Sequence, residues 1–134
     1  MTSRPSLIQL LQRGTSVIDG GLSTQLERRG CVLEGTLWTA HTLLNNPELI
    51  LQAHRDFIEA GAKVVITASY QISRKGFQAV GLTASDADEA LRKSMQIARA
   101  AAADTDVLVA ASIGPYGAIL HDGSEYKGNY GLTH

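Results

Sequence analysis

The chain has 134 residues, of which 44% are hydrophobic and 19% charged, and its formal net charge is −1. This composition is typical of one globular domain and argues against intrinsic disorder. Without a basic excess, nucleic acid is not an expected partner, and no apolar run is long enough to span a bilayer. The only cysteine, Cys31, excludes an intrachain disulfide and, with an N-terminus that resembles no secretion signal, favours the cytoplasm.

The first half of the chain predicts several short helices and one strand. Apolar spacing and capping residues place helices over residues 7–11, 22–29 and 36–44. A short strand is predicted over residues 16–19. The strongest helix signal follows Asn46, a suitable N-cap, with Pro47 in the first turn.

Two apolar, β-branched runs in the second half predict buried strands over residues 63–69 and 106–112. Between them a helix is expected over residues 83–103, with Ser85 and Asp88 at capping-box spacing. Residues 114–131 are expected to form a loop because glycines punctuate them. The buried stripe of the helix is expected to consist of Ala87, Leu91, Met95, Ala98 and Ala102.

Strands that alternate with helices indicate an α/β fold with a parallel sheet and right-handed crossovers. Polar and glycine residues gather where the predicted strands end, at Asp19, Tyr70 and Gly114, and this edge carries ligand sites in α/β folds. We expect the inner face of the sheet to be lined by Val17, Val65, Thr67, Leu108 and Ala110, or by their alternates.

The residues alone leave two interpretations open for each group at this edge. Asp19 either faces a ligand, which the following glycines allow to approach, or only caps the next helix. Tyr70 and its neighbours either bind a small polar ligand or cover the strand ends. Residues 114–117 either form the wall of a site or a plain surface loop. The four histidines do not cluster in the sequence, so histidines alone are not expected to build a metal site.

Four stretches of the chain, taken in order, resemble the zinc-dependent homocysteine S-methyltransferases. The resemblance is to the branch that takes a methyl group from S-methylmethionine or S-adenosylmethionine. The matching stretches are VIDGGLSTQLERRG (residues 17–30), LWTAHTLLNNPELI (37–50), HRDFIEAGAKVVITASYQIS (54–73) and VAASIGPYGAILHDGSEYKGNYG (109–131).

This resemblance implies that residues 1–134 are one partial domain, the N-terminal portion of a homocysteine-binding (β/α)8 TIM barrel with its first three strands. The family's zinc is held by three cysteines in GxNC-type and GGCC-type segments, which this chain lacks, and Cys31 matches neither. Asp19 would pair with the substrate ammonium. The stretches that match the family's homocysteine site imply substrate-binding roles for Asp19, Gly20, Thr67, Ser69, Tyr70, Ser112, Gly114 and Tyr116.

The implied reaction is methyl transfer from a sulfonium to homocysteine, which yields methionine. We expect the isolated chain to be inactive because it lacks the cysteine ligands, and to self-associate through its open strand edges. The alternative is a non-catalytic protein, either a truncated product or a small amino-acid-binding module. A third possibility is a companion chain that supplies the rest of the barrel.

Overall fold

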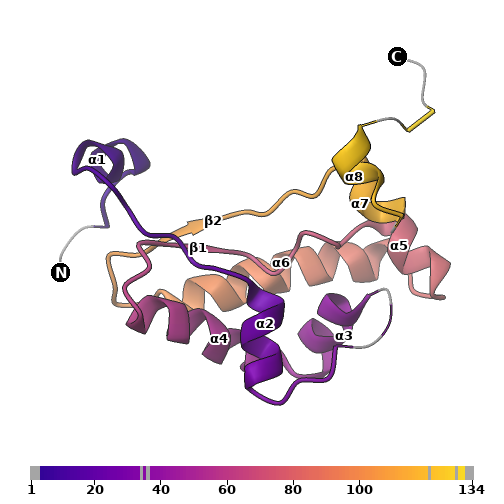
Figure 1. Ribbon diagram of the computed structural model, residues 1–134. Coiled ribbons are helices and arrows are strands. Elements are labelled where there is room, and N and C mark those ends of the chain that lie inside the picture. The colour runs from indigo at the N-terminus through magenta and orange to yellow at the C-terminus, as the bar shows by residue number, and fades with distance from the viewer. Residues whose placement is uncertain (1–3, 34, 36, 121, 129, 132–134) are drawn as a thin grey trace.

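A small parallel sheet lies across a layer of helices in the computed structural model (Figure 1). The structure describes residues 4–33, 35, 37–120, 122–128, 130 and 131. The sheet consists of β1 (Val64–Ile66) and β2 (Leu108–Ala110), which pair in parallel with Val65 opposite Val109. The predicted parallel pairing is therefore confirmed, although both strands are shorter than expected.

The strand expected over residues 16–19 is wrong as a full strand, because only one bridge forms beside β1. Ile18 pairs with Val64 in an isolated parallel bridge. The N–H of Asp19 donates to the Val64 carbonyl at 3.0 Å, and the N–H of Lys63 donates to the Val17 carbonyl at 2.7 Å. Val17 and Ile18 are 62% and 55% exposed, so burial adds little to these bonds. The three segments still run side by side in parallel, with β1 in the middle.

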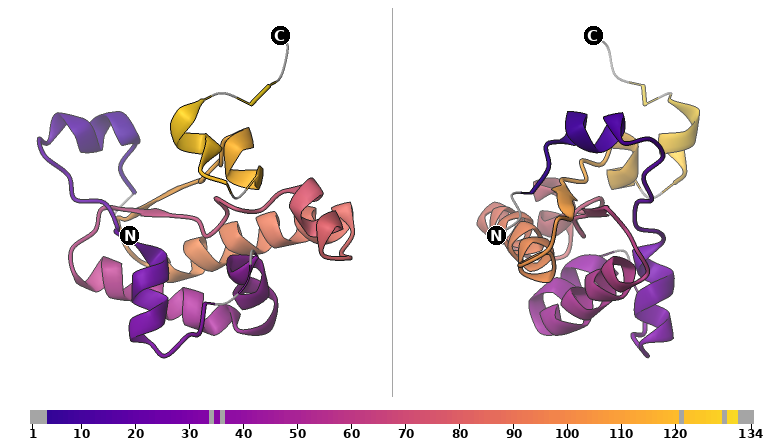
Figure 2. Two further views of the ribbon diagram at one scale, coloured as in Figure 1. Left: turned by 45° about the vertical axis from the view of Figure 1, so that its right-hand side comes forward. Right: turned by 90° about the vertical axis from the view of Figure 1, so that its left-hand side faces the viewer.

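The helices lie on both sides of this sheet (Figure 2). On one side, α4 and α6 cover the sheet, and α2 and α3 pack against α4. On the other side, α1, α7 and α8 leave the middle of the sheet uncovered. The helices are α1 (Leu7–Gln12), α2 (Leu22–Arg28), α3 (Trp38–Asn45), α4 (Pro47–Glu59), α5 (Arg74–Ala79), α6 (Ala84–Ala101), α7 (Tyr116–Leu120) and α8 (Ser124–Lys127).

The predicted long helix is confirmed as α6, but its capping residues and its buried stripe differ from the prediction. The capping box joins Thr83 to Asp86, whereas the expected partner Asp88 instead accepts hydrogen bonds from Arg74 at 2.9 and 2.8 Å. The alanines of the predicted stripe are buried, but Leu91 is 41% exposed. The predicted stripe is therefore buried only in part.

Three short helices have no counterpart among the predicted elements: α5, α7 and α8. Two of them fall within residues 114–131, where a loop was expected, so that prediction is wrong for these turns. Gly117 lies inside α7, where a Cβ atom would come within 2.5 Å of the Glu125 backbone nitrogen of α8. Glycine here permits two helical turns to pack closely and does not mark a loop.

The core lies mainly within the helical layer and between that layer and the sheet. Leu26, Leu43 and Ile50 are fully buried where α2, α3 and α4 meet. Val65 of β1 is also fully buried, against α4 and α6, whereas Leu108 of β2 is half-buried on the opposite face. The residues expected on one inner face therefore lie on two different faces, since Val65 points toward the helices and Leu108 lies on the opposite side. None of the described helices combines the length and apolarity needed to cross a bilayer.

Candidate functional site

A cavity of about 270 Å³ opens at the carboxyl ends of the parallel segments. It lies where the chain leaves the bridge at Ile18, β1 and β2, which is the edge at which α/β folds bind ligands. The cavity is lined by Asp19, Gly20, Leu22, Ser23, Ile66, Thr67, Ala68, Ser69, Tyr70, Gln71 and Ser112. The predicted site residues of the first two strands and Ser112 thus meet in one place.

Asp19 presents one free carboxylate oxygen to this cavity. Its Oδ2 accepts a hydrogen bond from the Ile66 N–H at 2.8 Å, which fixes the side chain across to β1. Its Oδ1 is buried and has no hydrogen-bond partner among the described residues. Burial raises the pKa of Asp19, and the Ile66 N–H partly opposes that rise. A buried acceptor of this kind calls for a donor, and a cation satisfies it best.

The interpretation of Asp19 as a helix cap is wrong. The N-cap of α2 is Gly21, and no side chain caps that helix end. Gly20 lies directly against α4, because a Cβ atom at this position would be 3.3 Å from Cε1 of Phe57. The two glycines therefore carry the chain closely past α4 into α2 and leave the Asp19 carboxylate to the cavity.

Thr67, Ser69 and Ser112 form a hydrogen-bonded connection between the ends of β1 and β2. The Ser69 hydroxyl donates to the Ser112 carbonyl at 2.7 Å. The Thr67 hydroxyl, 2.7 Å from Ser69 Oγ, then donates to Ser69 and accepts from the Ser112 N–H at 2.9 Å. Both hydroxyl protons are thus used within the protein. These side chains shape the cavity wall and replace strand pairing, which explains why both strands end early.

Gln71 lines the cavity but is not among the site residues predicted from the sequence. Its Oε1 is buried without a hydrogen-bond partner among the described residues. Together with Asp19 Oδ1 it gives the cavity two unpaired acceptors. The sequence signal was its position directly after Tyr70, at the end of a predicted strand.

Gly114 and Tyr116 lie outside the cavity lining. Gly114 packs against the backbone of Tyr70, since a Cβ atom there would be 2.1 Å from the Tyr70 carbonyl oxygen. Tyr116, on α7, contacts the ring of Tyr130 with centroids 5.7 Å apart. Gly114 therefore supports Tyr70 through its backbone, whereas Tyr116 belongs to a neighbouring cluster of aromatic residues.

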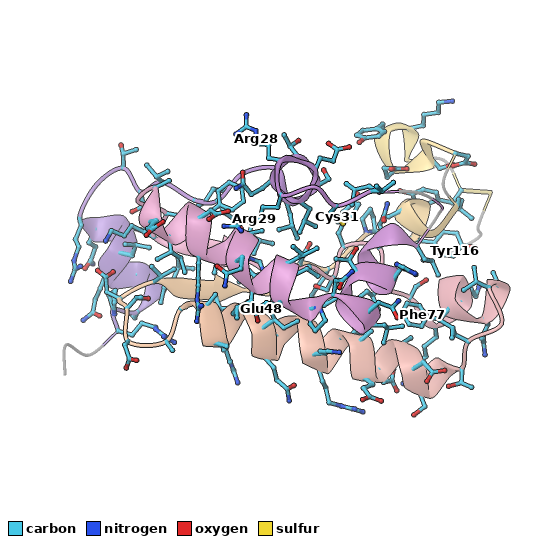
Figure 3. The ribbon with its side chains drawn as sticks, turned by 90° about the horizontal axis from the view of Figure 1, so that it is seen from below. Arg28, Arg29, Cys31, Glu48, Phe77 and Tyr116 are labelled. Atoms are coloured by element: carbon cyan, nitrogen blue, oxygen red, sulfur yellow. The ribbon has the colours of Figure 1, made fainter. Side chains whose placement is uncertain are left out.

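The described residues do not fit a zinc ion held by three cysteines. Cys31 is the only cysteine, and its Sγ lies 3.7 Å from the Thr42 hydroxyl on the helical side of the molecule. Figure 3 shows Cys31 near α2, well separated from Tyr116 on α7. Across the described part of the chain, no group of three His, Cys, Asp or Glu side chains is placed to hold a metal ion.

Parallel segments that end at a cavity with two unpaired acceptors define an α/β protein with a candidate small-molecule site at its strand ends. A sequence profile described as homocysteine S-methyltransferase matches residues 16–134. The chain therefore belongs to the homocysteine S-methyltransferase family, and the resemblance described from the sequence is confirmed.

Relatives in bacteria and plants are similar over most of this chain. A homocysteine S-methyltransferase of Bacillus subtilis is 45% identical over 87% of the chain, and one from Escherichia coli is 47% identical over 85%. The crystal structure of the metallated form of an E. coli homocysteine methyltransferase superposes with a TM-score of 0.85 over 94% of the chain at 43% identity. The chain spans only 41%, 39% and 47% of these relatives' own lengths.

Proposed function

We propose that this chain forms the amino-acid-binding part of a homocysteine S-methyltransferase site, within the N-terminal portion of a (β/α)8 barrel. One observation carries the proposal: Asp19 Oδ1 and Gln71 Oε1 are both buried and unpaired at a cavity at the strand ends. The ammonium group of an amino acid supplies the donors that both oxygens lack. The names of the similar proteins, together with this geometry, support homocysteine as that amino acid.

In this proposal the chain's own residues bind and orient the substrate. Asp19 accepts a charge-assisted hydrogen bond from the ammonium while the Ile66 N–H keeps its carboxylate in place. Thr67 and Ser69 hold the wall behind it through Ser112. Orientation of this kind contributes to catalysis by fixing the reacting sulfur relative to the donor.

The reaction we propose for the complete site transfers a methyl group from a sulfonium, S-methylmethionine or S-adenosylmethionine, to homocysteine. The sulfur of homocysteine forms a bond to the methyl carbon, the bond from that carbon to the sulfonium breaks, and the donor leaves as a neutral thioether. The thiol proton is lost to solvent. A free thiol has a pKa of about 8.5, so only a few per cent is thiolate at neutral pH. We therefore propose that this chain alone does not catalyse the reaction, since it lacks the cysteines that hold the family's zinc.

Binding of homocysteine without activity would also fit the alternative hypothesis, in which the chain is a small amino-acid-binding module. The open sheet favours a different proposal, in which further strands, on this or a companion chain, complete the site. The single reduced cysteine agrees with a cytoplasmic protein. Methionine formation from homocysteine and S-methylmethionine, above a blank without protein, would contradict the inactivity of the chain.

Calorimetric titration of homocysteine into the full chain tests the proposed binding. Asp19→Asn keeps the hydrogen bond from Ile66 but removes the charge, so we expect it to weaken homocysteine binding about tenfold or more. Asp104→Asn removes an exposed carboxylate away from the cavity and serves as the matched control. Equal affinities for the two variants would contradict the role proposed for Asp19.

A further inference from the structure

A cluster of aromatic side chains and one carboxylate lies beside the cavity, beyond Tyr70. Tyr116 and Tyr130 meet edge to face, with ring planes at 78°. Gly117 allows this approach, because a Cβ atom there would be 2.6 Å from Cε1 of Tyr130. Glu125 of α8 packs against the same glycine through its backbone. The cluster thus brings together residues from α7, from α8 and from the segment that follows α8.

Glu125 brings an unpaired negative charge to this cluster. Its Oε2 is buried and has no hydrogen-bond partner among the described residues. Burial raises the pKa of the Tyr70 phenol, and the nearby charge of Glu125 raises it further. Glu125 therefore lies within electrostatic reach of the tyrosine that also lines the cavity. A buried carboxylate oxygen without a donor is costly unless a cation approaches it.

The aromatic part of the cluster already attracts a positive charge. The ammonium of Lys75 lies 5.4 Å from the centroid of the Tyr116 ring, within the range of a cation–π contact. A primary ammonium or a metal ion is more strongly hydrated than a methylated cation, so it loses more when it leaves water for an aromatic face. A methylated cation is weakly hydrated and spreads its charge over its methyl groups, so it gains most from tyrosine faces next to a carboxylate.

We propose that Tyr70, Tyr116, Tyr130 and Glu125 form a subsite for a methylated sulfonium, next to the amino-acid cavity. As the site of the methyl donor, this assignment rests on the proposed function; as a cation site, it rests on the cluster alone. Tyr70 also lines the cavity, so a sulfonium in the cluster would lie near the bound amino acid. When the methyl group leaves, the sulfonium becomes a neutral thioether and loses its attraction to the cluster. The same residues would thereby favour binding of the donor over its product.

Titration of the full chain with trimethylsulfonium, followed by NMR of the tyrosine ring protons, tests the subsite. We expect saturable shifts with trimethylsulfonium and none with tert-butanol, a neutral probe of similar shape, or with potassium ions. Glu125→Gln and Tyr130→Leu should each weaken binding about fivefold or more, and Tyr130→Phe should restore it because the ring is kept. Tyr126→Leu is the matched control, since Tyr126 is 88% exposed on the same helix as Glu125.

The outcomes separate the subsite from the proposed function. Glu125→Gln should leave homocysteine affinity within about twofold, while Asp19→Asn should leave trimethylsulfonium affinity within about twofold, because the two cations occupy different places. Trimethylsulfonium binding without homocysteine binding would retain the subsite and reject the proposed function. Equal weakening by Tyr126→Leu and Tyr130→Leu, or equal binding of tert-butanol, would overturn the subsite.

Discussion

The two faces of the sheet differ in how completely the chain covers them. On the helical face, α4 and α6 bury Val65 fully, and α2 and α3 extend the core away from the sheet. On the other face, Leu108 stays half-buried. The helical face is therefore part of a well-packed hydrophobic core. On the second face, the described helices leave the middle of the sheet uncovered.

The site lies at the boundary between these two regions. Asp19 is fixed to β1 through Ile66, and Thr67 is fixed to β2 through Ser112. These hydrogen bonds join both side chains to the sheet, whose helical face is well packed. The buried oxygens Asp19 Oδ1 and Gln71 Oε1, by contrast, have no hydrogen-bond partner among the described residues. Stability and binding should therefore respond to different substitutions, and the following predictions separate them.

The largest difference in the free energy of unfolding should appear when an isoleucine is replaced by alanine on each side of the sheet. Ile50 is fully buried in α4, whereas Ile8 of α1 is 68% exposed. Ile50→Ala removes apolar volume from a packed core and should lower the free energy of unfolding by about 2–5 kcal/mol. Ile8→Ala should change it by no more than about 0.5 kcal/mol. Urea denaturation measures both, and similar losses would mean that α1 is as well packed as α4.

A second effect of nearly that size should appear in acid. His54 is fully buried in α4, neither ring nitrogen has a partner among the described residues, and burial lowers its pKa from 6.5 to about 4. The folded chain thus keeps His54 neutral, while the unfolded chain protonates it below pH 6.5. The free energy of unfolding therefore has its full contribution from neutral His54 above pH 6.5. It loses about 3 kcal/mol of that contribution as the pH falls toward 4.

Stability measured against pH in two matched variants checks this account of His54. His54→Leu should remove that part of the decline between pH 6.5 and 4. His41→Leu, at an exposed position of α3, should retain it. The same decline in both variants would assign the acid sensitivity to other groups.

A smaller effect should appear in association at the open edge. Ile18 pairs with β1 on one side only and is 55% exposed. We expect the chain to self-associate at micromolar concentration, and Ile18→Lys to weaken this association about tenfold, because a charge on an edge strand opposes pairing. Val32→Lys, at a 74% exposed position beyond α2, should have no such effect. Sedimentation velocity distinguishes the two, and a monodisperse wild-type monomer would contradict the prediction.

Much of this arrangement could be predicted from the sequence where local signals and tertiary packing agree. Pro47 begins α4 as expected, and the β-branched run around Val65 forms the central strand. Asp19 and Thr67 could be placed at a common edge because parallel strands end together. The family resemblance named the same residues from whole stretches of sequence.

The remainder could not be predicted because long-range contacts decide it. Gly117 signals a loop in the sequence, yet it permits α7 to pack on Glu125. The hydroxyl protons of Thr67 and Ser69 are used within the protein, which only the position of Ser112 reveals. The unpaired oxygen of Gln71 depends on burial in the folded chain and leaves no local pattern.

We propose that the cavity recognises the ammonium of homocysteine. The most direct test compares the affinity of the wild-type chain for homocysteine with its affinity for 4-mercaptobutanoate, which lacks only the amino group. We predict that the loss of the ammonium weakens binding at least about tenfold, because Asp19 Oδ1 and Gln71 Oε1 are then buried without a donor. Equal affinities for the two compounds would contradict the account.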